Sequence, residues 1–479
     1  MSTRTGHFER MSAGDATFLA VETPRAHMHV GAVAVFDGGP LTEPDGRLAF
    51  ERIRDHLLGA LAAFPRYRQR VVTTPVLGQP VWVDDEHFDV GYHLRHTRLP
   101  LPGDQRQLKR LAGRIFSQRL DRAHPLWELW LVEGLDGGQV AIIAKIHHCL
   151  LDGIAGVSLL TALLRGTPDA TVAAPRGWPA PRPAPRRREL VRGELAHHVA
   201  TLGRGARALT IAREPATWDR ARAGVAGAIG LLRRGLVPAS PTPWNARHIG
   251  PHRRFDVATL ELGRIKLVKD SLGGTVNDVA LTVVTGALAR TLLRHGVDPS
   301  TVRDFRALVP VNVRPDAARG ALGNHVAMLL APLPVEVAEP LARYQRVRET
   351  TRWLKQQAGH TAGAALLTQL ADATATGLLG TIFSTAIRLR AFNAVVTNVP
   401  GPPFPLWLLG ARLHEIYPFV PLFETQGLGI ALMSYTGRMF VGLSADWHGL
   451  DDLHDLALDL DTELALLVDL AASQPASSA

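Results

Sequence analysis

The chain has 479 residues, of which 46% are hydrophobic and 20% are charged, so it can bury sizeable cores and is long enough for two domains. Its one cysteine, Cys149, excludes an internal disulfide bond and favours a reducing compartment. No run of about 18 apolar residues predicts a transmembrane helix, and the N-terminus lacks the apolar core of a secretion signal. The net charge of +9 is local, because residues 176–254 hold sixteen arginines against four acidic residues.

The first part of the chain predicts alternating strands and helices, which is typical of an α/β domain. The run 28–36 is apolar and ends at the turn signal Asp37-Gly-Gly-Pro40, so it predicts a strand preceded by a lead-in segment at 11–19. The other elements predicted here are helices over 47–63 and 103–118 and short strands near 78–84 and 88–97.

Pro125, Leu126 and Trp127 stand immediately before another predicted strand. An aromatic residue beside a proline most often packs in a core, but it can also line a binding tunnel, and the two roles are compatible. His124, which precedes them, is expected at the surface.

The stretch 141–153 carries the clearest chemistry. An apolar run predicts a buried strand that stops at His147 and His148, and the helical spacing of the residues after Gly153 predicts a helix. The pair therefore lies where a strand delivers its C-terminal end to a helix, which is where clefts form in α/β domains. Asp152 completes the pattern HHxxxDG. A histidine here can take the proton of a hydroxyl that attacks a thioester, because its pKa of about 6.5 suits a base near neutral pH.

The histidine pair also allows a second interpretation, in which both residues are packed or bind a metal at the strand end. Zinc is disfavoured, because adjacent histidines lack the i, i+4 spacing of a helical metal pair and no cysteine cluster accompanies them. We therefore expect no metal. Cys149 would point away from His148 in an extended segment, so a packing role is expected for it instead of a nucleophilic one.

Residues 171–189 are rich in proline and arginine and predict an exposed linker. Two amphipathic helices are predicted after it, one with Leu195 and Val199 in its apolar stripe and one with Ile229 and Leu232. Their arginines suit an anionic lipid surface, where each contributes about 1 kcal/mol. An inter-domain helical hairpin with its stripe on the protein is an equally good interpretation. Nucleic acid is not expected, because no nucleic-acid motif is present and aromatic residues are sparse.

A second domain is predicted to begin near Asn245, with a strand over 255–262 and a long apolar helix after it. Thr275 or Asn277 can cap this helix, and Asp278 suits the positive end of its dipole. Capping alone can explain these polar residues.

The remaining chain continues the alternation of strands and helices. Arg314 ends a predicted strand at 305–315 and can be an ordinary exposed residue before a proline. The other elements predicted here are strands over 328–333 and 393–402, long helices within 338–390, two strands within 427–446 and a helix over 450–472.

These motifs together resemble a known family. HHxxxDG is the signature of the chloramphenicol-acetyltransferase and condensation-domain superfamily, and the flanking stretches resemble the bacterial wax ester synthase/acyl-CoA:diacylglycerol acyltransferases over nearly the whole chain. The resemblance implies that the second histidine is the general base and that the aspartate holds the site together. It implies a catalytic site of His148, His147 and Asp152, structural support from Gly153 and from Arg314 as the partner of Asp152, and substrate binding by Pro125, Leu126, Trp127, Asn277, Asp278 and Asn398.

We therefore expect two α/β domains of the chloramphenicol-acetyltransferase type, with mixed sheets flanked by helices and the active-site tunnel between them. The N-terminal domain would span residues 1–175 and carry HHxxxDG. The arginine-rich linker with its amphipathic helices would span 176–243, and the C-terminal domain 244–479.

The same resemblance implies an O-acyltransferase that moves a long-chain acyl group from acyl-CoA to diacylglycerol or to a long-chain alcohol. Acyl-CoA would be a co-substrate, and no other cofactor is expected. The enzyme would contact a membrane or lipid-droplet surface peripherally, from the cytoplasm at the inner face of the plasma membrane or on lipid droplets. Two other interpretations stay open: a condensation-type enzyme that takes acyl groups from a carrier protein, and a non-catalytic protein that binds lipid surfaces.

Overall fold

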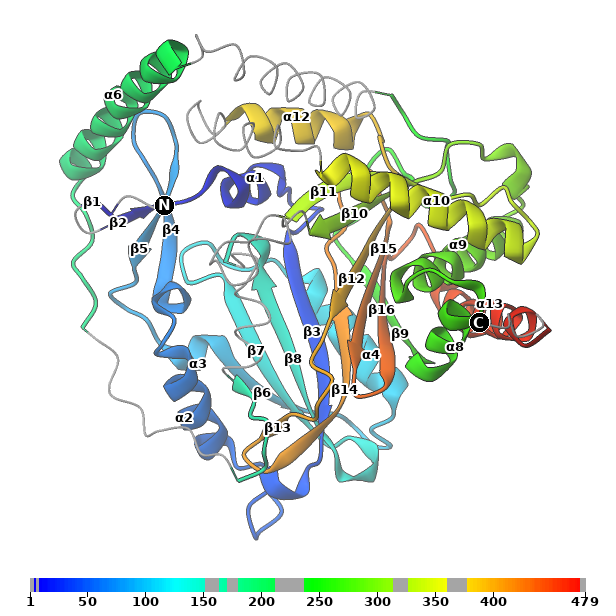
Figure 1. Cartoon of the computed structure of the whole chain (residues 1–479). Helices are drawn as coiled ribbons and strands as arrows, with labels where there is room; N and C mark the ends of the chain where they lie inside the picture. Colours follow the sequence, from blue (N-terminus) through cyan, green and yellow to red (C-terminus); the bar gives the residue numbers. More distant parts are fainter. Residues whose placement is uncertain are drawn as a thin grey trace.

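The computed structural model describes residues 4–5, 8–150, 163–169, 180–211, 237–312, 326–359 and 377–473. Within them the chain forms two six-stranded mixed sheets and one four-stranded sheet (Figure 1). The two large sheets stand side by side in the middle of the molecule, and most helices lie at its periphery. The predicted α/β class with two mixed sheets is confirmed.

The first large sheet is built around a strand that is buried along almost its whole length. The strands, in the order in which they pair, are β13 (Trp407–Leu408), β14 (Ala411–Phe419), β3 (His29–Phe36), β8 (Val140–His147), β7 (Trp127–Glu133) and β6 (Leu94–Arg98). β8 pairs antiparallel with both β3 and β7, which explains the unbroken apolar run that predicted it. The strand predicted over 88–97 starts later, because Val90–His93 forms the short helix α3.

Two helices of this half confirm the predicted positions. They are α2 (Phe50–Leu61) and α4 (Gln105–Ser117). Asp104 starts α4 with a capping box, in which its side chain accepts from the Gln107 amide and the Gln107 side chain accepts from the Asp104 amide.

A buried lysine fixes the end of α4 on the first sheet. Lys145 of β8 is fully buried, and its Nζ lies 3.1 Å from Glu128 Oε2. The same nitrogen donates to the carbonyl oxygens of Ile115 and Gln118, at 3.1 Å each. All three donors of the ammonium are therefore satisfied. Burial lowers the pKa of Lys145, and the Glu128 carboxylate opposes this shift.

The second large sheet carries the core of the C-terminal half. Its strands, in pairing order, are β11 (Val326–Pro332), β10 (Arg306–Asn312), β12 (Ala394–Pro400), β15 (Leu428–Tyr435), β16 (Arg438–Asp446) and β9 (Arg253–Glu261). Its helices are α8 (Leu262–Leu272), α9 (Val276–Arg294), α10 (Pro340–Gly359) and α13 (Leu453–Ser473). One continuous apolar cluster joins these helices to the sheet.

α9 is apolar on nearly all sides. Among the described residues it is the one helix long and apolar enough to cross a membrane, but most of it is buried against α13, α10 and α8. A core helix that is covered on every side meets the same criterion, which accounts for the composition of α9.

The two large sheets are interlocked because the C-terminal half supplies two strands of the first sheet. After β12 the chain crosses over, and β14 pairs antiparallel with β3 from Leu413 to Phe419. The sheets therefore do not follow the order of the sequence. The domain limits predicted at 175/176 and 243/244 stay a prediction.

β14 also approaches the second sheet closely. A side chain at Gly442 of β16 would place its Cβ only 1.7 Å from the carbonyl oxygen of Pro418 in β14. Only glycine lets the two backbones lie this close, since even the smallest side chain would collide with a backbone atom.

A four-stranded sheet and a long helix form a separate layer at one corner of the molecule (Figure 1). The strands, in pairing order, are β1 (Arg4–Thr5), β2 (Phe8–Arg10), β5 (Pro80–Asp84) and β4 (Gln69–Thr73), and the helix is α6 (Arg187–Ile211). The end of the predicted linker is anchored here, because Arg182 makes a bidentate contact with Asp84 at 2.9 and 3.1 Å.

An apolar cluster joins the opening helix of the chain to the second large sheet. It combines α1 (Ala13–Val21) and α12 (Gly377–Arg388), which pack on each other, with Leu308, Val395 and Ala431 of the second sheet. Phe18 of α1 packs at its border. The opening segment of the chain is thus placed at the junction of the two halves.

Replacement of Gly442 by alanine is expected to lower the free energy of unfolding by about 3 kcal/mol, because the backbone of β14 must move to admit the methyl group. Gly263→Ala in α8 is the matched control, since a Cβ there meets nothing within 4 Å and alanine favours a helix. Urea unfolding of the two variants measures the difference. Equal unfolding midpoints would contradict the close approach of the sheets.

Candidate active site

The histidine pair stands at the end of β8, at the junction between the two sheets. β8 ends at His147, and His148 opens a short 3₁₀ turn, η4 (His148–Leu150). The His147 amide donates to the carbonyl of Leu126 at 2.9 Å, and the His148 amide donates to the carbonyl of Met28 at 2.8 Å. Backbone bonds to the residues that directly precede β7 and β3 therefore fix the position of the pair.

His148 is held by an aromatic ring. Phe18 of α1 stacks on its imidazole with ring centroids 3.7 Å apart and planes 13° from parallel. The Nδ1 atom of His148 is buried and meets no hydrogen-bond partner in another described residue. Burial lowers the pKa of His148 to about 4, although its own backbone carbonyl opposes the shift. The imidazole is therefore neutral at pH 7, which is the form that a general base requires.

A neutral imidazole carries its hydrogen on one ring nitrogen and keeps a lone pair on the other. His148 as a whole is only partly buried, in contrast to its neighbours His147 and Cys149. The arrangement leaves one basic nitrogen to accept a proton from a bound hydroxyl.

His147 contacts other groups than His148 does. The backbone amide of Cys149 donates to His147 Nδ1 at 3.2 Å, so the hydrogen of the neutral ring resides on Nε2. Nε2 faces Glu22 Oε1 at 3.6 Å, an electrostatic contact slightly longer than a hydrogen bond. Burial lowers the pKa of His147, and the nearby carboxylate only partly opposes this. The ring is thus locked in one orientation.

Glu22, directly after α1, is the charge at the centre of this cluster. Its carboxylate is almost fully buried and receives Arg122 at 2.5 Å and Arg119 at 3.2 Å, both from the segment after α4. His29 of β3 lies 3.8 Å away on the other side. Burial alone would raise the pKa of Glu22, but contacts with His147 and Arg122 outweigh it and hold the pKa below its ordinary range.

No sequence pattern predicted this cluster. Glu22 follows the predicted lead-in segment, where an acidic residue is ordinary, and Arg119 and Arg122 lie about a hundred positions later. Phe18 was part of the predicted lead-in segment, but nothing placed its ring on His148. Only the pairing of β3 with β8, which sets His29 opposite His147, brings these residues together.

Cys149 lies inside the motif but not in a reactive setting. Its side chain is buried, and burial raises the pKa of the thiol well above its ordinary value. Its sulfur lies 3.0 Å from His147 Nδ1. A thiol that stays protonated is a poor nucleophile, which agrees with the packing role expected for it.

The other residues predicted for the site are only partly described by the structure. Asp152, Gly153 and Arg314 lie outside the described residues, so their support of the site and the pairing of Asp152 with Arg314 stay predictions. Pro125, Leu126 and Trp127 are described, and the Leu126 carbonyl contacts the His147 amide.

Trp127 lies on the other face of the sheet from His147. It pairs with Ile146, and neighbouring residues of a strand point to opposite faces. Its ring is buried against Tyr67 and His93, and its Nε1 donates to the Tyr67 carbonyl at 2.7 Å. The observed place is a core position, and a role in acyl binding stays a prediction.

Asn277, Asp278 and Asn398 meet at the start of α9. Asn398 Nδ2 donates to Asn277 Oδ1 at 3.1 Å, although the two residues are far apart in the sequence. Asp278 forms a capping box with Thr275 and accepts a hydrogen bond from Thr351 at 2.5 Å, which confirms the predicted cap. No hydrogen bond or ring contact between described residues joins this group to the histidines, so its role in substrate binding stays a prediction.

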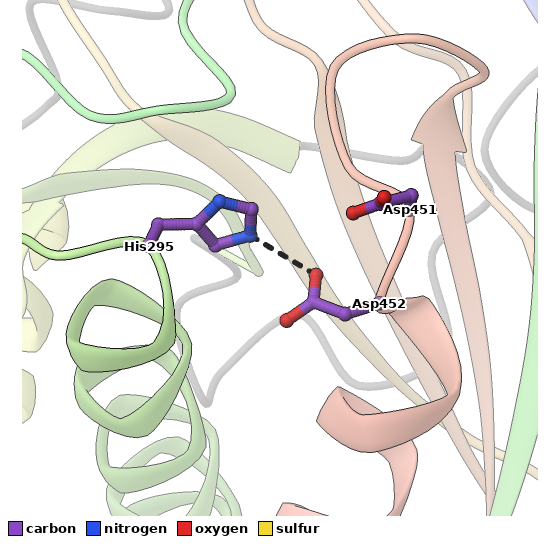
Figure 2. A group of neighbouring side chains, drawn as sticks. All are labelled: His295, Asp451 and Asp452. Atoms are coloured by element: carbon purple, nitrogen blue, oxygen red, sulfur yellow. Dashed lines mark hydrogen bonds and ion pairs between the residues drawn. The ribbon is translucent and has the colours of Figure 1, made fainter.

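One group of described side chains has the composition of a cation site. It contains His295, Asp451 and Asp452, which approach one another between α9 and α13 (Figure 2). Both oxygens of Asp452 already have partners, because Oδ1 contacts His295 Nε2 at 3.1 Å and Oδ2 accepts from Arg294 at 2.8 Å. A guanidinium on the same carboxylate opposes a second cation, so this group is better explained as a tie between the two helices. The expected absence of a metal stays a prediction.

Comparison with known protein families identifies the family of this chain. The description "wax ester synthase/diacylglycerol acyltransferase catalytic domain" matches residues 11–280, and the WS/DGAT C-terminal domain matches residues 322–468. The first match alone covers more than half of the chain. The chain belongs to the wax ester synthase/diacylglycerol acyltransferase family.

Individual relatives agree with this membership. A putative diacylglycerol O-acyltransferase of Mycobacterium tuberculosis CDC 1551 is 32% identical, over 98% of this chain and 92% of the relative. A probable diacylglycerol O-acyltransferase of M. tuberculosis H37Rv is 31% identical, over 95% of this chain and 94% of the relative.

Solved structures extend the likeness to the fold. The wax ester synthase/diacylglycerol acyltransferase of Marinobacter aquaeolei VT8 superposes with a TM-score of 0.68 at 27% identity, over 97% of this chain and all of that one. The first condensation domain of the CDA synthetase shares the fold at 19% identity, with a TM-score of 0.57, over 98% of this chain and 97% of that one. The protein is therefore an acyltransferase. Like its family, it uses acyl-CoA to form triacylglycerol or wax esters.

Replacement of Glu22 by glutamine is expected to lower the free energy of unfolding by about 1–3 kcal/mol at pH 7, because two half-exposed guanidiniums and His147 lose their carboxylate. The folded pKa of Glu22 lies below its unfolded value of about 4.3, so the stabilisation is complete above that pH and is lost as the pH falls through the folded pKa. Urea unfolding at several pH values measures this. Glu51→Gln, at an exposed ion pair, is the control expected to change little. A pH-independent difference would contradict the assignment.

Replacement of Phe18 by alanine is expected to move the acid limb of the kcat/KM profile upward, toward the unperturbed histidine pKa of about 6.5. The wild-type limb should lie near the lowered pKa of His148, and loss of the stacked ring admits water to the imidazole. Rates between about pH 3.5 and pH 8 measure the acid limb of the wild type and that of the variant. Phe404→Ala, at a half-exposed ring elsewhere, should leave the limb in place. An unchanged limb in Phe18→Ala would argue that burial by this ring does not set the pKa.

Proposed function

We propose that the enzyme transfers a long-chain acyl group from acyl-CoA to diacylglycerol, and also to long-chain alcohols, with His148 as the general base. The observation that carries this proposal is the place of His148 at the end of β8, where Phe18 stacks on its imidazole and the Met28 carbonyl accepts from its backbone amide; burial lowers its pKa and keeps the imidazole neutral. His147 and Asp152 complete the site as positioning residues. Acyl-CoA is a co-substrate, and no further cofactor takes part in the proposed reaction.

The proposed reaction needs one base and no acyl-enzyme. His148 Nε2 takes the proton of the acceptor hydroxyl as its oxygen attacks the thioester carbonyl, so a C–O bond forms and a tetrahedral intermediate follows. The C–S bond then breaks, and the proton passes from the imidazolium to the leaving thiolate of CoA. The products are an ester and free CoA, and the histidine returns to its neutral form.

The acceptor lipids are insoluble, so the enzyme works at a lipid surface. We place it in the cytoplasm, peripherally bound to the inner face of the plasma membrane or to lipid droplets. Support comes from the arginine-rich segment 176–254, since basic residues attract anionic lipids. Diacylglycerol is favoured over a fatty alcohol by the names of the mycobacterial relatives. A carrier-protein donor and a non-catalytic lipid-binding role are the two alternatives.

Replacement of His148 by alanine is expected to reduce acyl transfer by about 10²–10⁴-fold, which is the usual contribution of a general base. Release of CoA from palmitoyl-CoA, with diolein or hexadecanol as acceptor, measures the rate. The acceptor with the higher kcat/KM identifies the main activity.

The same assay separates the alternatives. Circular dichroism and urea unfolding of His148→Ala check that the variant folds, and His124→Ala, a partly exposed residue, is the matched histidine control. A wild-type enzyme that releases no CoA with either acceptor would favour a carrier-bound donor. A folded His148→Ala variant as active as wild type would remove His148 as the base.

A further inference from the structure

α6 turns one face to the protein. Leu190 is buried in the apolar cluster of the four-stranded sheet, together with Phe8. A Cβ at Gly193 would lie 2.5 Å from the Phe8 ring, so the helix backbone sits directly on that ring. Glu194, only 1% exposed, belongs to the same face. At about 100° per residue these three positions mark the inward side of the helix.

The opposite face of α6 points to solvent and combines charge with apolar surface. Arg188, Arg192, Leu195 and Val199 follow one another at spacings of four, three and four residues, which places them on one stripe. Both arginines are exposed, and Leu195 and Val199 are 56% and 71% exposed. The apolar stripe predicted for this helix therefore does not pack on the protein at these two positions, as an inter-domain hairpin would require.

The turn between β4 and β5 adds a second apolar element beside this helix. Glu194 accepts hydrogen bonds from Thr74 Oγ1 at 2.6 Å and from the backbone amides of Leu77 and Val76 at 2.8 and 3.2 Å. The turn is thus fixed to α6 by a buried carboxylate, yet Val76 and Leu77 are 60% and 49% exposed. Figure 1 shows this hairpin and α6 together at one corner of the molecule.

We propose that these exposed side chains form a docking surface for an anionic lipid bilayer. The α6–hairpin surface is defined by Arg188, Arg192, Leu195, Val199, Val76 and Leu77. Its arginines complement anionic headgroups, and its four aliphatic side chains can enter the boundary between headgroups and acyl chains. Exposed apolar patches mark interaction sites, and Glu194 holds this apolar turn in a fixed position at the surface.

The surface is joined to the active site by a short length of chain. Arg10, at the end of β2, donates to the Gly193 carbonyl of α6 and to Gln79 Oε1 of the hairpin, at 2.6 Å each. The chain then enters α1, whose Phe18 stacks on His148. A bilayer bound to this surface lies at the corner from which the helix over His148 starts. The assignment rests on the proposed function, since a diacylglycerol acceptor resides in a lipid surface.

Flotation of the full-length enzyme with vesicles tests the surface. Wild type is expected to float with vesicles that contain phosphatidylglycerol and less with phosphatidylcholine alone, and salt should weaken the difference. Arg188→Gln with Arg192→Gln should reduce partitioning about 25-fold, at about fivefold per arginine. Leu77→Ser with Leu195→Ser should reduce it about 100-fold, at about tenfold per side chain.

The controls are exposed residues of the same kinds in other places. Leu458→Ser in α13, where the leucine is 57% exposed, and Arg346→Gln in α10 should float like wild type. Each variant keeps the backbone amides that bind Glu194, and urea unfolding confirms that all are folded. Equal flotation of the surface variants and the controls would overturn the proposal.

Activity and oligomeric state separate this proposal from the proposed function. Surface variants should lose transfer to diolein in vesicles but keep transfer to hexadecanol carried on albumin. A wild type that floats but transfers no acyl group would refute the function and leave the docking surface standing. Loss of a wild-type dimer in the leucine variants, without loss of flotation, would assign the surface to a second copy of the chain and overturn lipid docking.

Discussion

One buried carboxylate, Glu22, holds together three segments that are distant in the sequence. It stands between His147 and His29 on the ends of two paired strands and receives Arg119 and Arg122 from the segment after α4. Because the two histidines are neutral, the guanidiniums supply the compensating charge, and their exposure to solvent keeps the desolvation cost moderate. Lys145 fixes the end of α4 from which those arginines start. The orientation of His147 thus depends on charges outside its motif.

The interlocked sheets explain why the site lies where it does. A strand from the C-terminal half completes the first sheet beside β3, and glycine at position 442 lets that strand approach the second sheet. α1 and α12 pack on each other and on apolar side chains of the second sheet, and Phe18 at the border of this cluster stacks on His148. The residues that contact the histidine pair, Phe18, Met28 and Leu126, belong to the N-terminal half. The C-terminal half supports them through α12, which packs on α1.

The sequence predicted those features that depend on neighbouring residues. An unbroken apolar run predicted β8, and Thr275 and Asp278 predicted the cap of α9. The histidine pair was predicted at the end of that strand. The transfer of β14 to the first sheet, the Glu22 cluster and the Asn277–Asn398 contact were not predictable in this way, because each joins residues separated by about a hundred positions or more. The stripe on α6 was visible in the sequence, but which face of the helix the protein covers depended on Phe8 and Gly193.

The lowered pKa of His148 has a cost as well as a benefit in the proposed reaction. At pH 7 a histidine with the ordinary pKa of about 6.5 is already about three-quarters neutral, so a further decrease adds little base. A lower pKa also makes the imidazole a weaker proton acceptor. Burial under Phe18 is therefore not explained by basicity. We propose instead that it serves to exclude water, since an activated water at this nitrogen would hydrolyse the thioester instead of letting the lipid hydroxyl attack it. In this proposal the Phe18 ring favours transfer over hydrolysis, and the weaker base is the consequence.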